Sequence, residues 1–157
     1  MIRTSILSLS LFLVFTSTWA QQAATPSIEI IEQAGTGVLR IQADGQGKNR
    51  QLAEEDVRQR VLERLLYDGI AHPQITAVRL PMIPDRSKLT AVQLEALKDV
   101  LKPENTKRYY TDVLWVEQRP TRTSEGTKLQ LFNVTINYDL FRRELETRGI
   151  LRKFGYR

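Results

Sequence analysis

The chain has 157 residues, with 23 Lys and Arg against 18 Asp and Glu, a formal net charge of +5, and no cysteine. This length suits one domain, and the lack of cysteine excludes a disulfide framework and a thiolate metal site. The basic excess is too small to indicate nucleic-acid binding, although it suits contact with anionic surfaces.

The first twenty residues have the organisation of a secretory signal peptide. Arg3 precedes an apolar run, residues 6–15, and Thr18 and Ala20 supply small residues at positions −3 and −1 of a cleavage site. The run is shorter than the roughly 20 residues that a transmembrane helix needs. Since no cysteine follows it, we expect an exported protein, periplasmic or outer-membrane-associated, without a lipid anchor. An exported domain of this size without disulfides indicates a bacterial envelope protein.

After the signal peptide we expect a flexible leader, residues 21–26, and a single domain, residues 27–157. Two strands are predicted at its start. Residues 27–33 are a short β-prone run, and residues 36–44 alternate with the period of a half-buried strand. The predicted buried side chains of the second strand are Leu39, Ile41 and Ala43. A glycine-rich turn, residues 45–48, is expected next, because glycine tolerates positive φ.

A long amphipathic helix follows this turn. Asn49 is its expected N-cap, apolar residues recur at every fourth position from Ala53 to Leu65, and Gly69 is its expected stop. The acidic residues 54–56 fall in the predicted first turn, where they suit the helix dipole.

The middle of the chain is less regular. Residues 75–80 are compatible with a short strand, and Pro81 and Pro84 interrupt regular structure directly after it. Thr90 and Gln93 form the capping-box pattern of a second helix. Pro103 lies just past the predicted end of this helix, and residues 104–107 are expected to be a loop.

A long hairpin is predicted in the last third. Residues 108–118 are rich in β-branched and aromatic side chains, and residues 128–138 alternate between apolar and polar. Glu125 and Gly126 are the expected tip, which is either an interaction arm or an inert loop.

A final helix closes the chain, with Asn137 or Asp139 as its cap and Gly149 as its stop. The predicted order is β-β-α-α-β-β-α. This order favours an α+β fold in which helices cover one face of an antiparallel or mixed sheet.

The segment Gly45-Gln46-Gly47-Lys48 has the layout of a phosphate-binding loop but fails its motifs. A Walker A loop needs glycine at the position of Gln42 and Ser or Thr at the position of Asn49. A dinucleotide fingerprint needs glycine at the position of Arg50. We therefore expect no cofactor, although Lys48 and Arg50 beside a helix N-terminus are compatible with anion binding.

No catalytic or metal-binding constellation is found. His72 is the single histidine, and no cysteine is present to complete a metal site with it. None of Ser27, Ser87 and Ser124 lies in a nucleophile-elbow pattern. The plentiful carboxylates leave a carboxylate-based hydrolase as a remote alternative. We predict no enzyme, no catalytic residue and no metal ligand.

The C-terminal segment "FRRELETRGILRKFGYR" mixes basic and aromatic side chains, a composition that suits anionic polymers, lipid headgroups or an acidic protein groove. It also suits a solvated helix face. The residues predicted as possible anion or partner contacts are Lys48, Arg50, Arg152, Lys153 and Arg157.

A strand ending in "ADGQGKNR" before a helix beginning "QLAEEDVRQRVLERLLYDGI" resembles a group of small exported proteins of Bacteroidetes-type bacteria, and "INYDLFRRELETRGI" fits their closing strand and helix. More remotely, the unit is similar to the N-terminal domain of flagellar assembly protein T and related envelope lipoproteins. The resemblance implies an envelope domain that works by contact and brings no catalytic residues. The chain departs from the lipoproteins by lacking a lipidation cysteine.

We therefore predict a non-enzymatic accessory or assembly component of the cell envelope, with an envelope protein complex as its partner. Docking is expected through a sheet edge, at the strands that begin near Ser27 or Arg108, or through the basic C-terminal tail. The alternative is a glycan- or anionic-lipid-binding module that contacts peptidoglycan or an anionic membrane surface. No nucleic acid is expected as a partner.

Overall fold

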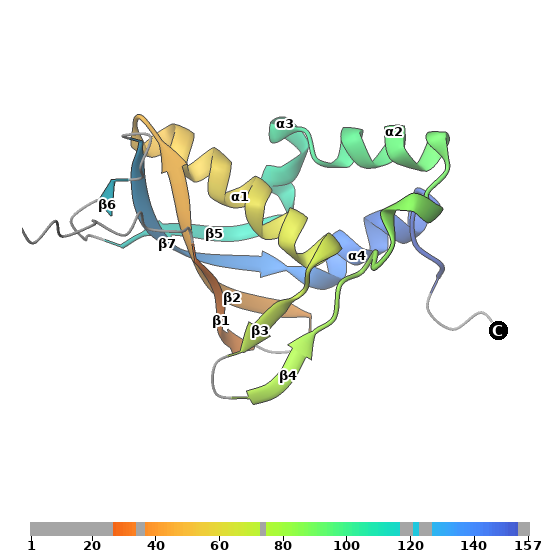
Figure 1. Cartoon of the computed structure of the whole chain (residues 1–157), viewed down its shortest axis with the longest axis horizontal. Coiled ribbons are helices and arrows are strands. Elements are labelled where there is room, and N and C mark those ends of the chain that lie inside the picture. Colours follow the sequence, from red (N-terminus) through yellow and green to blue (C-terminus); the bar gives the residue numbers. More distant parts are fainter. Residues whose placement is uncertain (1–26, 34–36, 73–74, 117–120, 123–126, 154–157) are drawn as a thin grey trace, which may run out of the picture.

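The computed structural model describes residues 27–33, 37–72, 75–116, 121–122 and 127–153. The predicted signal peptide, the leader, the hairpin tip and Arg157 lie outside these residues. The fold is α+β, as predicted from the sequence, with an antiparallel main sheet and helices packed against it (Figure 1).

The main sheet has the strand order β1-β2-β7-β5, and β6 pairs with β7 beyond the end of β5. All its pairings are antiparallel. The strands are β1 (Ile28–Gln33), β2 (Val38–Gly47), β5 (Tyr110–Trp115), β6 (Thr121–Arg122) and β7 (Lys128–Asn137).

The two central strands, β2 and β7, bury one face and leave the other polar, as their alternating sequences predict. The buried cross-strand pairs are Leu39–Ile136, Ile41–Val134 and Ala43–Phe132. On the opposite face, the amide of Gln42 donates to Asn133 Oδ1 at 3.2 Å. An antiparallel sheet with one solvent-exposed face alternates apolar and polar residues, because successive side chains point to opposite sides.

Helix α1 (Arg50–Tyr67) lies on the apolar face of the sheet, with its buried side in contact with β2 and β7. Its N-cap is Asn49, whose Oδ1 accepts the N–H of Leu52 at 2.9 Å, and Gly69 follows it with φ of 75°. Both were predicted. The predicted place of the acidic residues 54–56 was wrong: the helix begins at Arg50, so they fall after its first turn.

The middle of the chain contains more elements than predicted. β3 (Ile70–His72) and β4 (Ile75–Arg79) form a separate hairpin, and β3 lies beside β1. A short 3-10 turn, η1 (Arg86–Lys88), precedes α2 (Ala91–Val100), which has the predicted capping box. The expected loop after α2 is instead α3 (Pro103–Thr106) and a second 3-10 turn, η2 (Lys107–Tyr109). Pro103 is the first residue of α3 because a missing N–H costs nothing there.

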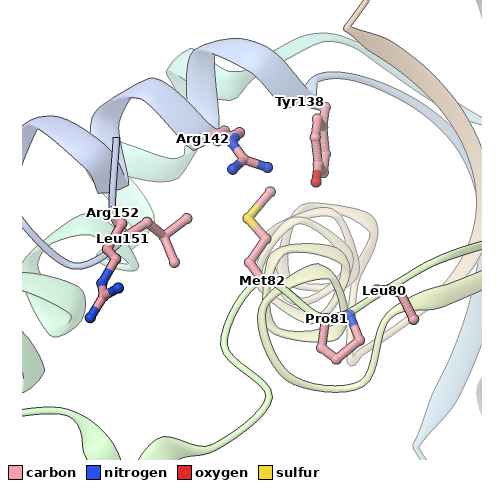
Figure 2. A pocket seen from close by; sticks show the side chains of 7 residues that line it. All are labelled: Leu80, Pro81, Met82, Tyr138, Arg142, Leu151 and Arg152. Carbon is pink, nitrogen blue, oxygen red and sulfur yellow. The ribbon is translucent and has the colours of Figure 1, made fainter. Parts of the chain in front are cut away.

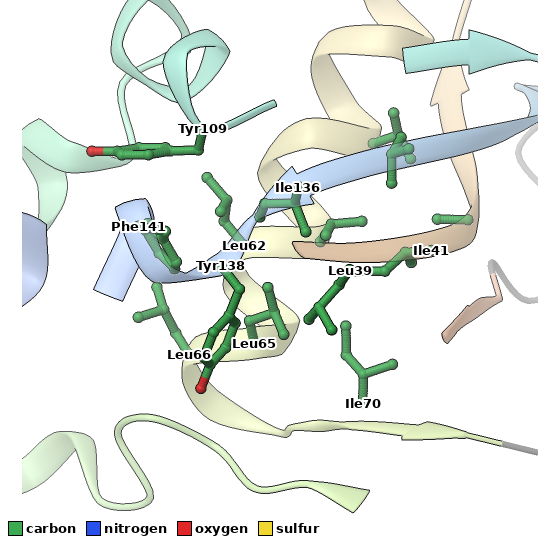
Figure 3. Packing of buried hydrophobic residues seen from close by; sticks show 14 of the residues in the cluster. Leu39, Ile41, Leu62, Leu65, Leu66, Ile70, Tyr109, Ile136, Tyr138 and Phe141 are labelled. Atoms are coloured by element: carbon green, nitrogen blue, oxygen red, sulfur yellow. The ribbon is translucent and has the colours of Figure 1, made fainter. Parts of the chain in front are cut away.

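Helix α4 (Tyr138–Thr147) follows β7 directly and closes the core (Figure 3). Asn137 caps it through the N–H of Leu140 at 2.9 Å, so of the two predicted caps Asn137 is the one used. Gly149, with φ of 70°, ends it. The ring of Phe141 packs edge-on against Tyr109, with the ring centres 5.0 Å apart. This contact joins α4 to the chain between α3 and β5.

Within the described part of the chain, no helix is both long enough and apolar enough to cross a membrane.

Candidate functional site

The two glycines that suggested a phosphate cradle belong to the end of strand β2. Gly45 and Gly47 pair with Gln130 and Lys128 of β7, and neither has positive φ. A Cβ on Gly45 would overlap the carbonyl oxygen of Ala53, and one on Gly47 would lie 2.5 Å from the Ala53 nitrogen. The prediction of a glycine turn was therefore wrong. These glycines let the first turns of α1 lie close against the strand.

Polar groups where β2 meets α1 already form hydrogen bonds within the protein. Asp56 accepts the backbone N–H of Gln46 at 2.7 Å, in addition to the cap formed by Asn49. A bound phosphate would meet the carboxylate of Asp56, so the junction of β2 and α1 is a poor anion site. Arg50 places its guanidinium 5.3 Å from the ring centre of Trp115, while Lys48 is exposed.

The predicted cationic contacts do not form one site. Lys48 and Arg50 lie at the N-terminal end of α1. Arg152 and Lys153 are exposed beyond α4, and Arg152 lies beside the chain at Met82, which is bonded to the C-terminal end of α1. An 18-residue helix is about 27 Å long, which separates the two groups.

A pocket of about 480 Å³ lies at the C-terminal end of α1, between the segment after β4 and the segments around α4 (Figure 2). Its lining residues are Leu80, Pro81, Met82, Tyr138, Arg142, Leu151 and Arg152. The N–H groups of Met82 and Ile83 donate to the carbonyls of Leu65 and Leu66, at 3.1 and 2.7 Å. These bonds hold the segment after β4, which forms one side of the pocket, against α1.

A network of ion pairs lies between α2, η2 and α4. Arg148 contacts Asp99 at 2.7 Å and Glu144 at 2.6 Å, and Arg108 contacts Glu144 at 2.9 Å. Hydrogen bonds from Lys102 and Arg148 lower the pKa of Asp99, and the bond from Arg148 is the main cause of the lowered pKa of Glu144. Each acid is matched by a cation, so the network is a structural clamp.

The remaining catalytic candidates are engaged locally. In the described part of the chain, no group of three or more acidic or histidine side chains can hold a metal ion. Ser27 donates to Asp44 at 2.9 Å and Ser87 to Asp85 at 2.6 Å, and Ser124 lies outside the described residues. Of the clustered carboxylates in α1, Glu54 pairs with Arg58 and Asp56 with Arg60, each one turn along the helix.

Both predicted edge strands are edges of the main sheet. Among the described residues, β1 pairs only with β2, and β5 only with β7. They differ in what flanks them, since the β3–β4 hairpin lies beside β1. On β5, Leu114 is 56% exposed and Trp115 is 38% exposed.

The sequence reasoning missed two of these features. It did not identify Leu114 and Trp115 as exposed side chains of an edge, because an apolar residue in a strand is normally assigned to the core. It also did not predict the pocket, although the prolines after β4 marked a segment that leaves regular structure.

No family model matches the chain, and neither a curated protein nor a solved structure matches it significantly. The likeness to the envelope proteins and to flagellar assembly protein T stays a prediction.

Proposed function

We propose that the protein is an exported, non-enzymatic component of the bacterial cell envelope that docks to a partner protein through the edge strand β5. The observation that carries the proposal is a strand that, among the described residues, is paired on one side only and bears two exposed apolar side chains, Leu114 and Trp115. An open strand edge is a template for an added strand, and neighbouring side chains supply specificity.

β5 is a better docking edge than β1. The hairpin β3–β4 lies beside β1, whose exposed side chains include the acidic Glu29 and Glu32. Charged side chains are one of the means by which proteins protect an edge from pairing. On β5, Asp112 is the only charged residue of the strand, so the edge is less protected.

The proposed compartment rests on the signal-peptide pattern of residues 1–20, and the proposed partner is an envelope protein. The cationic groups lie at the two ends of α1, about 27 Å apart, so they do not converge on one compact anion site. The docking edge is therefore the first surface to test.

The test is crosslinking of tagged protein in cells, followed by recovery from the envelope fraction and mass spectrometry. We expect one partner in stoichiometric amount, lost in Leu114→Lys and retained in Leu140→Lys. Leu140 is the matched control because it is an exposed leucine on α4, 43% accessible. Exposed substitutions of this kind change stability by about 0.5 kcal/mol or less.

Two results would overturn the proposal: a partner retained equally by both variants, or no protein partner at all. Circular dichroism of both variants checks that a lost partner does not reflect a lost fold.

A further inference from the structure

We propose that the pocket at the C-terminal end of α1 binds a small amphipathic anion, a carboxylate that carries a short apolar chain. This inference goes beyond the docking function and does not rest on it, because no pocket residue belongs to β5.

The size of the pocket fits a small molecule. Its volume of about 480 Å³ lies in the range of small-molecule sites, which combine apolar walls with a few polar groups that fix orientation. Leu80, Pro81, Met82 and Leu151 supply apolar surface from two segments about 70 residues apart in the sequence. Figure 2 shows the hydroxyl of Tyr138 and the guanidinium of Arg142 directed toward Met82.

The charge of the lining selects an anion. Two of the seven lining residues are arginines and none is acidic. Glu146 accepts from Arg142 Nε at 2.9 Å, which holds this guanidinium in position. Arg152 is exposed and has no ion-pair partner among the described residues. Arginine presents a planar fork of donors that matches a carboxylate, so Arg152 is the main charged contact.

The apolar side chains that line the pocket make an alkyl chain on the ligand necessary for tight binding. Leu80 is 76% exposed and Met82 is half-buried, so both present apolar surface to water. Covering this surface removes apolar area from water, which favours binding in proportion to the area covered. A carboxylate without a chain gains nothing from this wall.

The experiment is calorimetric titration of the purified full chain with octanoate, octanamide and acetate. Octanamide keeps the chain and removes the charge, whereas acetate keeps the charge and removes the chain. We expect octanoate to bind at least about fivefold more tightly than either, because a hydrogen bond to a charged group and the buried alkyl chain each contribute more than the roughly 1.6 RT that a fivefold ratio requires.

Matched variants locate the site. We expect Arg152→Gln to weaken octanoate binding by about fivefold or more, and Lys153→Gln, its exposed neighbour outside the pocket, to change it less than about twofold. Leu80→Ser is expected to weaken octanoate but not acetate. Its control is Val92→Ser on α2, at a residue 79% exposed.

Three results would overturn the inference: no octanoate binding, equal binding of octanoate and acetate or of octanoate and octanamide, or equal losses in Arg152→Gln and Lys153→Gln. The last would mean diffuse attraction by the basic C-terminal segment. All four substituted residues are partly or largely exposed, so the variants are expected to fold, and circular dichroism checks this.

Discussion

Asp99 and Arg148, 49 residues apart in the sequence, meet at 2.7 Å and join α2 to the end of α4. Arg148 also contacts Glu144 within α4, and Lys102 contacts Asp99 within its own turn at 2.8 Å. The pair is therefore the link between two local ion pairs. Gln93 adds a neutral bond between the same elements, from its amide to the Gly149 carbonyl at 2.7 Å.

The first prediction concerns acid pH. The pKa values of Asp99 and Glu144 are lower in the folded chain than their ordinary values of 3.8 and 4.5. The stabilisation is therefore fully present above those values and is lost as pH falls below them through the folded pKa values. We expect the contribution of these ion pairs to the urea midpoint to be lost as the pH falls below about 4.5.

Asp99→Asn is expected to lower the urea midpoint at pH 7 and to flatten its fall at acid pH. Glu95→Gln is the control, since among the described residues Glu95 pairs only with Lys98, on the exposed face of the same helix. An identical pH profile for wild type and Asp99→Asn would show that the clamp contributes nothing.

The second prediction separates two kinds of glycine. Gly45 lies against backbone, so Gly45→Ala is expected to destabilise the fold by roughly 3 kcal/mol, the upper end of overpacking effects. Gly149 has open space around it but a φ of 70°, so Gly149→Ala is expected to cost about 1 kcal/mol.

Asparagine distinguishes the two causes. It tolerates the left-handed conformation, so Gly149→Asn should be milder than Gly149→Ala, whereas Gly45→Asn should be worse than Gly45→Ala. Urea unfolding of the four variants measures this. A reversal of either order would contradict the assigned cause.

These glycines show how far the sequence predicts the fold. Gly69 and Gly149 were predictable, because helix stops depend on residues within one turn. Gly45 was assigned to a turn. The neighbouring sequence does not distinguish a glycine that forms a turn from one that lets a helix pack closely against a strand. The alternating strands and the apolar face of α1 were predicted for the same local reason.

The site was less predictable than the fold. The basic residues of the C-terminal segment were identified, but the pocket needs Leu80 and Arg152 to line the same space, which only the packing of α4 brings about. The separation of Lys48 from Arg152 follows from the length of α1 once its direction in the fold is known. The exposure of Leu114 follows from strand order, which the hairpin pattern does not determine.

The third prediction concerns the core contact between Phe141 and Tyr109. Phe141 is fully buried and packs edge-on against Tyr109, at an interplanar angle of 61° (Figure 3). Phe141→Ala is expected to cost about 3–5 kcal/mol, because it removes apolar contacts and leaves a cavity. Leu140→Ala, at the exposed neighbouring position, is expected to cost less than about 1 kcal/mol. Equal losses of stability in Phe141→Ala and Leu140→Ala, measured by thermal denaturation, would contradict the central place of Phe141 in the core.

The last prediction concerns alkaline pH and has the opposite sign to the first. The hydroxyl of Tyr110 donates to the carbonyl of Arg58 at 2.5 Å, which joins the edge strand β5 to α1. Burial raises the pKa of Tyr110 well above 10.0. The folded chain therefore holds this proton more tightly than the unfolded chain, so the stabilisation is present below pH 10 and is lost as pH rises toward the folded pKa.

Tyr110→Phe is expected to cost about 0.5–1.5 kcal/mol at pH 7, the usual net value of one hydrogen bond. Its stability should then fall less than that of the wild type above pH 10, with Tyr67→Phe as the control. Tyr67 is a suitable comparison because its ring lies under Arg86, with the guanidinium 3.8 Å from the ring centre. If Tyr110→Phe loses stability above pH 10 as steeply as the wild type, another group controls the alkaline transition. Because the bond fixes β5 against α1, the same variant should also weaken partner binding at the proposed docking edge.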